Sequence, residues 1–555
     1  MTHPPQQGPA PEQPPHGPAA GQSPQDPAPE QPRPGGTFGP PPPDHPAGFG
    51  PPVPPGTGGF GPPVPPPPDG FGAPAPARGP EDGRGPGHRR RTAVVGAAVL
   101  AVALIVGGGI RYAVSKGDGG DKDGGNRAAG KPVDDGAGPA YEKPREKVPA
   151  DPKAFYKGAG GQPGLPEGES TYRVHGSWLT DKVFAKASVG RISGLDAATG
   201  TRVWVLPKPG MSCAGSPNLG RGNIAVVVTQ PPGEDERGTG APCTEVTAFD
   251  VDDGRKLWTK SVTIGYQKEK TAFNQATISG DTVAVAGLYG GAAFDLRSGR
   301  PLWKPRQGET CRDVGYGGGD QLVAVRSCGD HGSARIKVEV LDPASGRPRW
   351  SSGLPAGVRT PSVVSTRPVV VAADSGEITS SGASDVFSFD ARGRLRTKIA
   401  LPPERYMHQC GTQSVAEDCR GVTAGNDRLY VATARRDTAD GLTSTNDIVA
   451  FSLATGRTTG EKLAGGDNYP VFPIRMDGGN LLVYKSAPFT RVYSVHGRTL
   501  KQTLLLDAGA RPSSLVALRS ELRFTHGKLY ISGDLISRPT SKGSAPTMVF
   551  GFAAE

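Results

Sequence analysis

Short apolar runs, each bounded by polar and turn-forming residues, recur along the chain from Lys182 onward. A run of about four to eight residues between turn signals is typical of a buried β-strand, whereas a helix needs a longer pattern. We therefore predict eight buried strands, which begin at Lys182, Asn223, Asp281, Gln321, Pro368, Arg428, Asn480 and Lys528.

A ten-residue phrase follows each of the first four runs. In every copy a Gly stands four residues after an Asp, and a Trp stands eight residues after it. Asp can accept hydrogen bonds from turn amides, Gly tolerates positive φ, and Trp supplies a large buried face. The phrase thus predicts two strands joined by a tight turn, with a structural role for Asp196, Gly200, Trp204, Asp250, Gly254, Trp258, Asp295, Gly299, Trp303, Asp342, Gly346 and Trp350.

Four weaker copies continue the series at Phe389–Gly393, Phe451–Gly456, Tyr493–Gly497 and Val549–Phe552. The Asp positions of the strong copies lie 54, 45 and 47 residues apart, and such a period with several short strands per unit is the signature of a β-propeller. We predict an all-β, eight-bladed propeller, with seven blades as the alternative. Because the last unit ends before its outer strand, a strand between Ala154 and Val174 is expected to close the ring and remove a free edge.

The repeated phrase resembles the repeat of the pyrroloquinoline-quinone-like (PQQ-like) propellers, over about residues 170–555. The resemblance implies that each Trp docks its blade onto the next one. The plan of the whole chain is similar to that of membrane-anchored members in high-G+C Gram-positive bacteria. Enzymes of that superfamily hold the quinone with a calcium ion, a catalytic aspartate and, in the alcohol dehydrogenases, adjacent cysteines. This chain has no adjacent cysteines, and we predict no cofactor.

An uncharged segment from Thr92 to Ile110 is long enough to cross a bilayer as a helix, at about 1.5 Å per residue. We predict a transmembrane helix over residues 92–114. The basic cluster His88–Arg91 precedes it, so the N-terminus is expected in the cytoplasm and the propeller outside the cell membrane. A cleaved signal peptide is the alternative, but 91 residues before the apolar run far exceed a usual n-region.

The segments on either side of this span are rich in Pro and Gly. The first 86 residues hold 31 of the 59 prolines and too few aliphatic side chains to form a core, so residues 1–91 are predicted to be a disordered cytoplasmic tail. Its polyproline tracts either dock on a partner or remain solvated without one. Residues 115–168 are predicted to be a flexible linker, and residues 169–555 to be the propeller.

The formal net charge of +10 does not indicate nucleic-acid binding. The positive surplus is spread thinly over the predicted propeller, and the one dense basic run is His88–Arg91. We expect the membrane and a protein or cell-envelope partner, and no nucleic acid.

The six cysteines fall in three neighbouring pairs. In a fold whose strands pair mostly with their neighbours in sequence, each cysteine is expected to pair with the nearest cysteine along the chain, although six cysteines allow fifteen connectivities in principle. We predict disulfides Cys213–Cys243, Cys311–Cys328 and Cys410–Cys419, which suit a location outside the cytoplasm. A metal site is the alternative, but no CxxC spacing or His pair supports it.

No sequence motif marks a catalytic centre. The histidines are scattered, and G-x-S-x-G does not occur. We therefore predict a non-enzymatic binding or scaffold module that takes a protein, glycan or small ligand at one propeller face, with the irregular insertions Gly233–Cys243 and Tyr406–Cys419 as candidate contact loops. The alternative is a quinoprotein-like oxidoreductase, or a hydrolase or lyase, with its site at the channel mouth. Asp, Arg and His side chains clustered there would favour it.

Overall fold

The computed structural model describes residues 142–161, 164–165, 168–232, 241–264, 269–330, 333–376, 379, 381–411, 416–439, 441–466, 469–486, 489–510, 517–538 and 547–554. All of them belong to the second of two compact units of the chain, Ala128–Glu555. The predicted tail, the predicted transmembrane helix and most of the predicted linker lie outside the described residues. Within those residues, no helix combines the length and apolarity needed to cross a bilayer.

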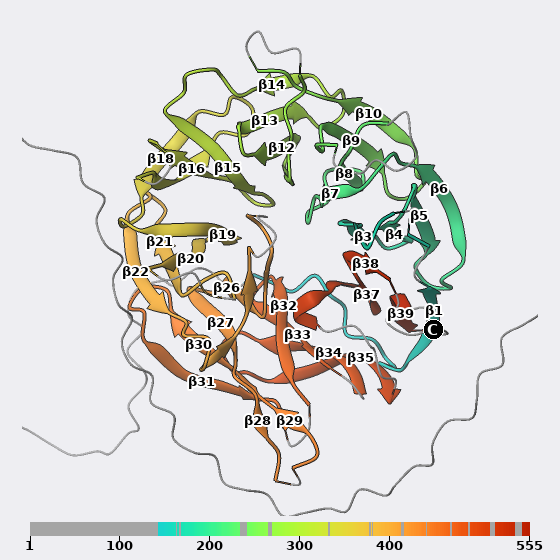
Figure 1. The fold of residues 1–555 in the computed structure, drawn as a ribbon. Helices are drawn as coiled ribbons and strands as arrows, with labels where there is room; N and C mark the ends of the chain where they lie inside the picture. Colours follow the sequence, from blue (N-terminus) through green and yellow to red (C-terminus); the bar gives the residue numbers. More distant parts are fainter. Residues whose placement is uncertain are drawn as a thin grey trace, which may run out of the picture. The chain divides into compact units, whose positions relative to one another are not determined.

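Eight antiparallel sheets, seven of four strands and one of five, are arranged as blades in a ring (Figure 1). This confirms the prediction of an all-β propeller with eight blades and excludes the alternative of seven. Blade 1 consists of β3 (Ser177–Leu179), β4 (Val183–Ala187), β5 (Arg191–Asp196) and β6 (Arg202–Pro207), and blade 2 of β7 (Ser212–Gly215), β8 (Ile224–Thr229), β9 (Glu245–Asp250) and β10 (Lys256–Lys260). Blade 3 consists of β11 (Gln275–Ser279), β12 (Thr282–Gly287), β13 (Gly290–Asp295) and β14 (Pro301–Trp303), and blade 4 of β15 (Cys311–Gly317), β16 (Leu322–Cys328), β17 (Arg335–Leu341) and β18 (Pro348–Gly353).

Blades 5 to 8 follow the same plan with insertions. Blade 5 consists of β19 (Val358–Thr366), β20 (Val369–Ser375), β21 (Asp385–Phe389) and β22 (Leu395–Ala400), and blade 6 of β23 (Tyr406–Met407), β26 (Val422–Gly425), β27 (Arg428–Thr433), β30 (Asp447–Ser452) and β31 (Thr458–Ala464). Blade 7 consists of β32 (Val471–Asp477), β33 (Asn480–Lys485), β34 (Phe489–His496) and β35 (Gln502–Ala510), and blade 8 of β36 (Glu521–Thr525), β37 (Lys528–Ser532), β39 (Thr547–Ala554) and β1 (Ala154–Gly161). Three small ladders join β2 (Thr171–Arg173) to β38 (Leu535–Ser537), β24 (Gln409–Cys410) to β25 (Cys419–Arg420), and β28 (Arg436–Asp437) to β29 (Ser444–Thr445). The described part of the chain has one short helix, a 3-10 turn at Ala517–Arg519.

The ring closes through its two ends. Strand β1 pairs antiparallel with β39, the last strand of the chain, so that Tyr156 lies opposite Phe552. This pairing confirms the prediction that a strand from before the first blade completes the last one.

The second strand of each blade lies between two neighbouring blades, which explains its unbroken apolar sequence. Every residue of β8 and β12 is buried, because both faces of these strands pack against other sheets. The outer strands are more open to solvent, as in β18, whose side chains are exposed or half-buried.

The repeated Asp belongs to the turn between the third and fourth strands. In blade 1 the Asp196 carboxylate accepts hydrogen bonds from the backbone N–H groups of Ala198 and Thr199, and Gly200 has φ of 76°. The backbone hydrogen bond from Thr199 in particular lowers the pKa of Asp196. This Asp therefore stabilises a turn.

The alignment of the seventh copy was wrong by two residues. In the predicted copy Tyr493–Gly497 the residue in the place of the repeated Asp would be Ser494. The turn begins at His496 instead, because the Leu500 N–H donates to the His496 carbonyl as the turn Gly does elsewhere. The ring Nδ1 of His496 accepts the backbone N–H groups of Arg498 and Thr499, and Leu500 takes a φ of 54°. An imidazole and a leucine thus perform the roles of Asp and Gly.

Each Trp of the repeat lies against the turn Gly of the following blade. A Cβ atom added at that Gly would lie 2.4 to 2.9 Å from the indole ring, far closer than van der Waals contact allows. The Trp258 Nε1 also donates to the Leu296 carbonyl at 2.9 Å. The Gly is therefore required for close approach as well as for its φ, in the pairs Trp204–Gly254, Trp258–Gly299, Trp303–Gly346 and Trp350–Gly393.

A strap, residues 142–153, crosses blades 7 and 8 before it enters β1 (Figure 1, cyan). The buried Asp477 carboxylate accepts the backbone N–H groups of Arg145 and Glu146, each at 3.0 Å. The Glu146 carboxylate in turn accepts Arg475 Nη2 and the His526 N–H, both at 2.7 Å. The strap is therefore fixed to the ring by charge-assisted hydrogen bonds.

Candidate functional site

The two faces of the ring differ in their connections. Because the strands of a blade alternate in direction, the links between blades and the second-to-third loops open on one face, which we call the loop face. The first-to-second and third-to-fourth turns open on the other, the turn face, and there no connection exceeds the eight residues 216–223. The long connections are all on the loop face: 230–244, 261–274, 401–421, 434–446, 511–520 and 533–546.

Both candidate contact loops from the sequence, Gly233–Cys243 and Tyr406–Cys419, belong to the loop face. Residues 233–240 of the first and 412–415 of the second lie outside the described residues.

The six cysteines form three disulfides at this same face, in the nearest-neighbour pairing: Cys213–Cys243, Cys311–Cys328 and Cys410–Cys419. Each joins strand ends or a loop where the chain leaves a blade on the loop-face side. Cross-links at this edge restrict the strand ends and the loops attached to them.

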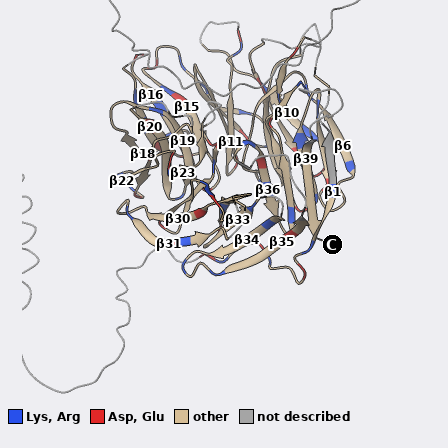
Figure 2. Cartoon of the chain, turned by 60° about the horizontal axis from the view of Figure 1, so that its bottom comes forward, with Lys and Arg blue, Asp and Glu red and all other residues tan. Residues whose placement is uncertain are grey.

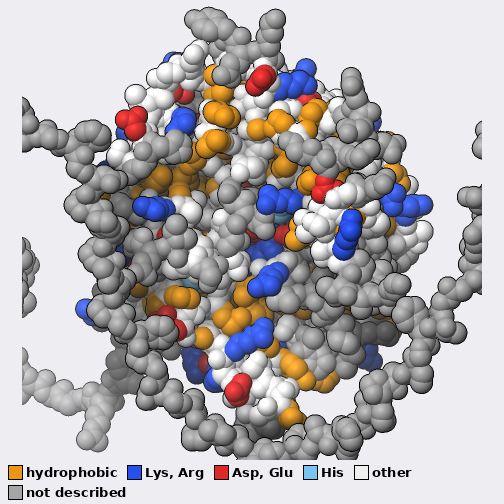
Figure 3. Space-filling model, viewed as in Figure 1, with side chains coloured by type: hydrophobic (Ala, Val, Ile, Leu, Met, Phe, Trp, Pro, Cys, Tyr) orange, Lys and Arg blue, Asp and Glu red, His pale blue; other side chains and the backbone are white. Residues whose placement is uncertain are grey.

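Large exposed apolar side chains also occur on the loop face. Leu288 and Tyr289, between β12 and β13, are 62% and 58% exposed, and Leu442, at the tip of the β28–β29 hairpin, is 86% exposed. Leu535 and Phe489 lie at the same edge of blades 8 and 7. Figure 3 shows one face of the propeller, on which hydrophobic side chains form several clusters with Lys and Arg between them. Five of the eleven large exposed apolar side chains thus lie on the loop face, and the other six lie on the strap and on outer strands. Exposed apolar groups that share one face are typical of an interaction surface.

The loop between blades 5 and 6 reaches into the central channel. The Glu417 carboxylate accepts Asn218 Nδ2 of blade 2 at 3.0 Å, Thr277 Oγ1 of blade 3 at 2.6 Å, and the Gly318 N–H of blade 4 at 3.1 Å. Burial raises the pKa of Glu417, and these hydrogen bonds oppose the rise. A loop from one blade thus occupies the channel and links three others.

An ion pair connects blades 8 and 1 at the channel mouth. Lys186 Nζ lies 2.7 Å from Glu521 Oε2, and the two side chains are 6% and 10% exposed. Burial would raise the pKa of Glu521, but the charges of Lys186 and Arg523 together lower it to about 2. Glu521 also accepts the Gly176 N–H, so its carboxylate has protein donors on both oxygens.

A second charged group lies beside the first, around a cavity of about 170 Å³. Arg420 donates to Asp418 at 3.0 Å and to Asp534 at 3.1 Å. His175 Nδ1 lies 3.8 Å from Asp534. Burial lowers the pKa of His175, while the charge of Asp534 opposes the shift. This is a cluster of Asp, Arg and His of the kind that would favour the enzyme alternative.

Sequence reasoning missed this cluster. The one available signal was Lys186, a charged residue inside a strand whose five residues are all buried, because buried lysines need a partner. The Asp, Gly and Trp residues of the repeat were singled out instead, and they lie in the turn-face turns and on the outer strands.

The residues of the channel do not fit a bound quinone and calcium ion. All six cysteines are in disulfides, and none is adjacent to another. The described residues contain no group of three His, Cys, Asp or Glu that could hold a metal. The carboxylates of Glu417 and Glu521 are already used by protein donors.

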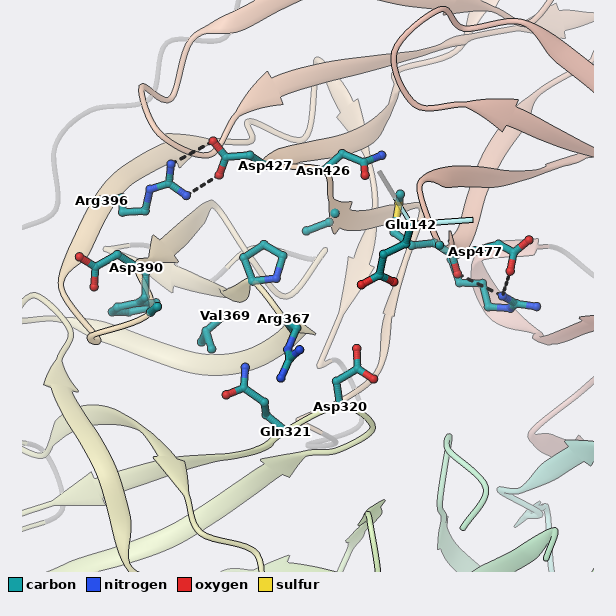
Figure 4. Close-up of a pocket in the computed structure, with 18 of the residues that line it drawn as sticks. Glu142, Asp320, Gln321, Arg367, Val369, Asp390, Arg396, Asn426, Asp427 and Asp477 are labelled. Carbon is teal, nitrogen blue, oxygen red and sulfur yellow. Dashed lines mark hydrogen bonds and ion pairs between the residues drawn. The ribbon is translucent and has the colours of Figure 1, made fainter. Parts of the chain in front are cut away.

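A groove of about 920 Å³ opens on the turn face, where blades 4 to 7 and the strap meet (Figure 4). Arg396 of blade 5 makes a bidentate ion pair with Asp427 of blade 6 across it, with Nη2 and Oδ2 at 3.0 Å. Glu142, Asp320 and Arg367 surround its opening. Nothing in the sequence placed these residues together.

Charges elsewhere are spread over the blades. Figure 2 shows basic and acidic residues interspersed along the strands, which fits the diffuse surplus counted from the sequence.

One lysine near the loop face is buried without an ion pair among the described residues. Lys208 Nζ donates to the Gly210 carbonyl at 2.5 Å and lies 5.9 Å from the Tyr172 ring. Burial, with a smaller contribution from the Lys186 charge, lowers its pKa from 10.5 to about 7.

Lys208→Met is expected to stabilise the propeller at pH 6.5, by on the order of 4 kcal/mol. Below pH 7 the folded protein must hold the Lys208 ammonium in a buried site, whereas the unfolded chain holds it in water. Between pH 7 and 10 the unfolded chain alone stays protonated, so the wild type gains stability as pH rises and the advantage of the variant shrinks. Urea unfolding at pH 6.5 and 9.5 measures this, with the exposed Lys256→Met as control. An advantage that does not change with pH would contradict the assignment.

The described residues form an eight-bladed β-propeller, and part of it is similar to a known family. Residues 174–327, which cover blades 1 to 3 and the first two strands of blade 4, match a family model described as outer membrane protein assembly factor BamB. No curated protein matches the chain.

Several solved structures are similar to this chain. BamB from Moraxella catarrhalis is 17% identical, with 70% of this chain and 99% of that chain covered at a TM-score of 0.39. Dihydro-heme d1 dehydrogenase NirN in complex with DHE is 12% identical, with coverages of 68% and 77% and a TM-score of 0.40. The Cps50 (Swd1) propeller domain of Myceliophteria thermophila is 11% identical, with coverages of 57% and 96% and a TM-score of 0.33. These similarities concern the propeller alone and do not identify what this chain binds.

Proposed function

We propose that the protein is a membrane-anchored scaffold whose propeller, outside the cytoplasm, binds a protein partner through the loop face. The observation that carries the proposal is the gathering on one face of the long insertions, three disulfides and the exposed side chains Leu288, Tyr289 and Leu442. Loops held on a rigid ring are where binding residues concentrate. The disulfides suit an oxidising compartment, in line with the basic cluster His88–Arg91 before the apolar segment. The Pro-rich tail would add a second, cytoplasmic contact.

Site-specific photo-crosslinking in intact cells tests this proposal. A photoreactive amino acid at Leu288 or Leu442 is expected to give an adduct of the same mass, because both positions would contact one partner. The matched control is Arg347, which is exposed on the turn face and is expected to give none. Tyr289→Ser should weaken the adduct from Leu442. If the loop-face positions gave no adduct, or a sugar rather than a protein, the proposal would fail.

The predicted location is tested on the same cells. A protease added outside is expected to remove the propeller and leave the tail protected. Digestion only after lysis would place the propeller in the cytoplasm and contradict the topology.

A second candidate function is an enzyme at the channel mouth, favoured by the pair His175–Asp534 beside the 170 Å³ cavity. In that case His175 would act as a base oriented by Asp534. Purified protein would then hydrolyse one of a panel of chromogenic esters, phosphates and glycosides, and His175→Gln would abolish that activity. The scaffold proposal expects no turnover that His175→Gln removes.

A further inference from the structure

The turn-face groove exists because the docking of blades changes at blade 5. In blades 1 and 2 the Trp Nε1 donates to a carbonyl of the next turn, as Trp204 does to Val251 at 3.1 Å. The turn of blade 5 is one residue shorter, from Asp390 to Gly393, and the Trp350 indole N–H has no acceptor among the described residues. Trp350 lines the groove instead.

The next seam has no Trp at all. Thr397 takes the place of the indole beside the turn Gly456, and a threonine fills much less of the space between blades. The bidentate pair Arg396–Asp427 spans the seam on the turn face. The missing indole and the shortened turn together leave the cavity of about 920 Å³.

Some charges of the groove are already neutralised. Arg475 pairs with Glu146 at 2.7 Å, Asp477 accepts two N–H groups of the strap, and Arg396 pairs with Asp427. These groups form the wall of the groove, and their charges are already paired within the protein.

Four charged side chains at the rim of the groove have no ion-pair partner among the described residues. Glu142, Arg145, Asp320 and Arg367 are exposed, and none makes a side-chain ion pair with another described residue. Figure 4 shows Glu142, Asp320 and Arg367 around one opening. Apolar side chains of Pro368, Val369 and Met476 lie between them in the lining. The groove thus offers both signs of charge across an apolar centre.

We propose that this groove binds an extended peptide segment of another protein, with an acidic and a basic side chain a few residues apart. Arg367 would take the carboxylate, and Asp320 and Glu142 the cationic group, which is charge complementarity of both signs. The lining holds four Arg and five Asp or Glu in all, so a polyanion would meet as much repulsion as attraction. The lining turns come from four consecutive blades, so a bound peptide could contact several blades at once. This site is distinct from the loop face and would make the propeller a two-sided adaptor.

The test uses the full chain in detergent micelles and a random heptapeptide phage library as the probe. Phage that bind the wild type are counter-selected on Arg367→Glu/Asp320→Lys. The enriched peptides are expected to carry Asp or Glu and Lys or Arg three to five residues apart. Labelled copies are then titrated by fluorescence anisotropy, and each single charge reversal should weaken binding at least about tenfold, the equivalent of one full ion pair to a desolvated partner. Arg347→Glu, on the same face outside the groove, should leave the affinity unchanged.

Each other outcome overturns the proposal. Purely acidic selected peptides would identify an anion site. Peptides that bind both charge-reversed and wild-type protein would lie outside the groove, and a library that yields no sensitive binder would mean that the groove takes no peptide. Because Arg367→Glu leaves the loop face intact, the Leu442 crosslink should persist in that variant, so a failure here is separate from a failure of the scaffold function.

Discussion

A propeller without residues 142–161 is expected not to close, and to lose cooperative unfolding. Those residues supply β1, the outer strand of blade 8, and the strap. Their removal exposes the hydrogen-bonding edge of β39 and uncovers Phe552, which is 1% exposed in the intact ring and lies 5.9 Å from the Tyr156 ring. It also leaves the buried Asp477 carboxylate without its two strap donors. A domain is stable by only about 5–15 kcal/mol in total, and losing a strand, a buried aromatic contact and two charge-assisted bonds is expected to consume most of it.

The measurement is thermal unfolding by circular dichroism, with size-exclusion chromatography to detect association through the open edge. The matched control begins at Glu142 and differs only in the deleted twenty residues. A synthetic peptide of residues 142–161, added in trans, should restore part of the transition. If the shorter protein melted like the control, β1 would not be the closing strand.

Trp258→Ala is expected to lower the stability of the propeller by about 3–5 kcal/mol. Trp258 is the most buried of the four repeat tryptophans, at 7% exposed. Its ring lies 5.6 Å from that of Phe294 and against Gly299 of blade 3, and its Nε1 donates to the Leu296 carbonyl. Alanine would remove the apolar contacts and leave that carbonyl without its donor, so the cavity and the lost hydrogen bond act together.

Two further variants separate the causes. Trp258→Phe keeps most of the volume and should cost less than Trp258→Ala. Gly299→Ala should be destabilising even with the indole present, because its Cβ would lie 2.7 Å from the ring and its φ is 66°. Thr259→Ala, exposed on the same strand, is the control. Calorimetry that showed an unchanged melting temperature for Trp258→Ala would exclude a docking role.

The parts of the fold that one sequence could predict are those in which the interacting residues are close in sequence. The spacing of Asp196, Gly200 and Trp204 defines a turn and its two strands, because all three act within ten residues. Cys311 and Cys328 could be paired because β15 and β16 are neighbours in one hairpin. The seventh turn was misaligned because His496 and Leu500 fill the same hydrogen-bonding and φ positions with different chemistry.

The sites were out of reach for the opposite reason. Lys186 and Glu521 are 335 residues apart and meet only because the ring brings blade 8 to blade 1. The groove joins turns from four blades, and no pattern within one blade reveals which turns will share a cavity. Convergence across a ring is a property of the closed fold and leaves no periodic signal in the chain.

The pairing of β1 with β39 also determines when the propeller can close during synthesis of the chain. Some 390 residues separate the two strands, and at roughly 5–20 residues per second the ribosome needs about 20–80 seconds to deliver the second after the first. During that interval β1 has no partner strand. The ring therefore cannot close until β39 has been made, and the pairing of β1 with β39, rather than the folding of any single blade, completes the propeller.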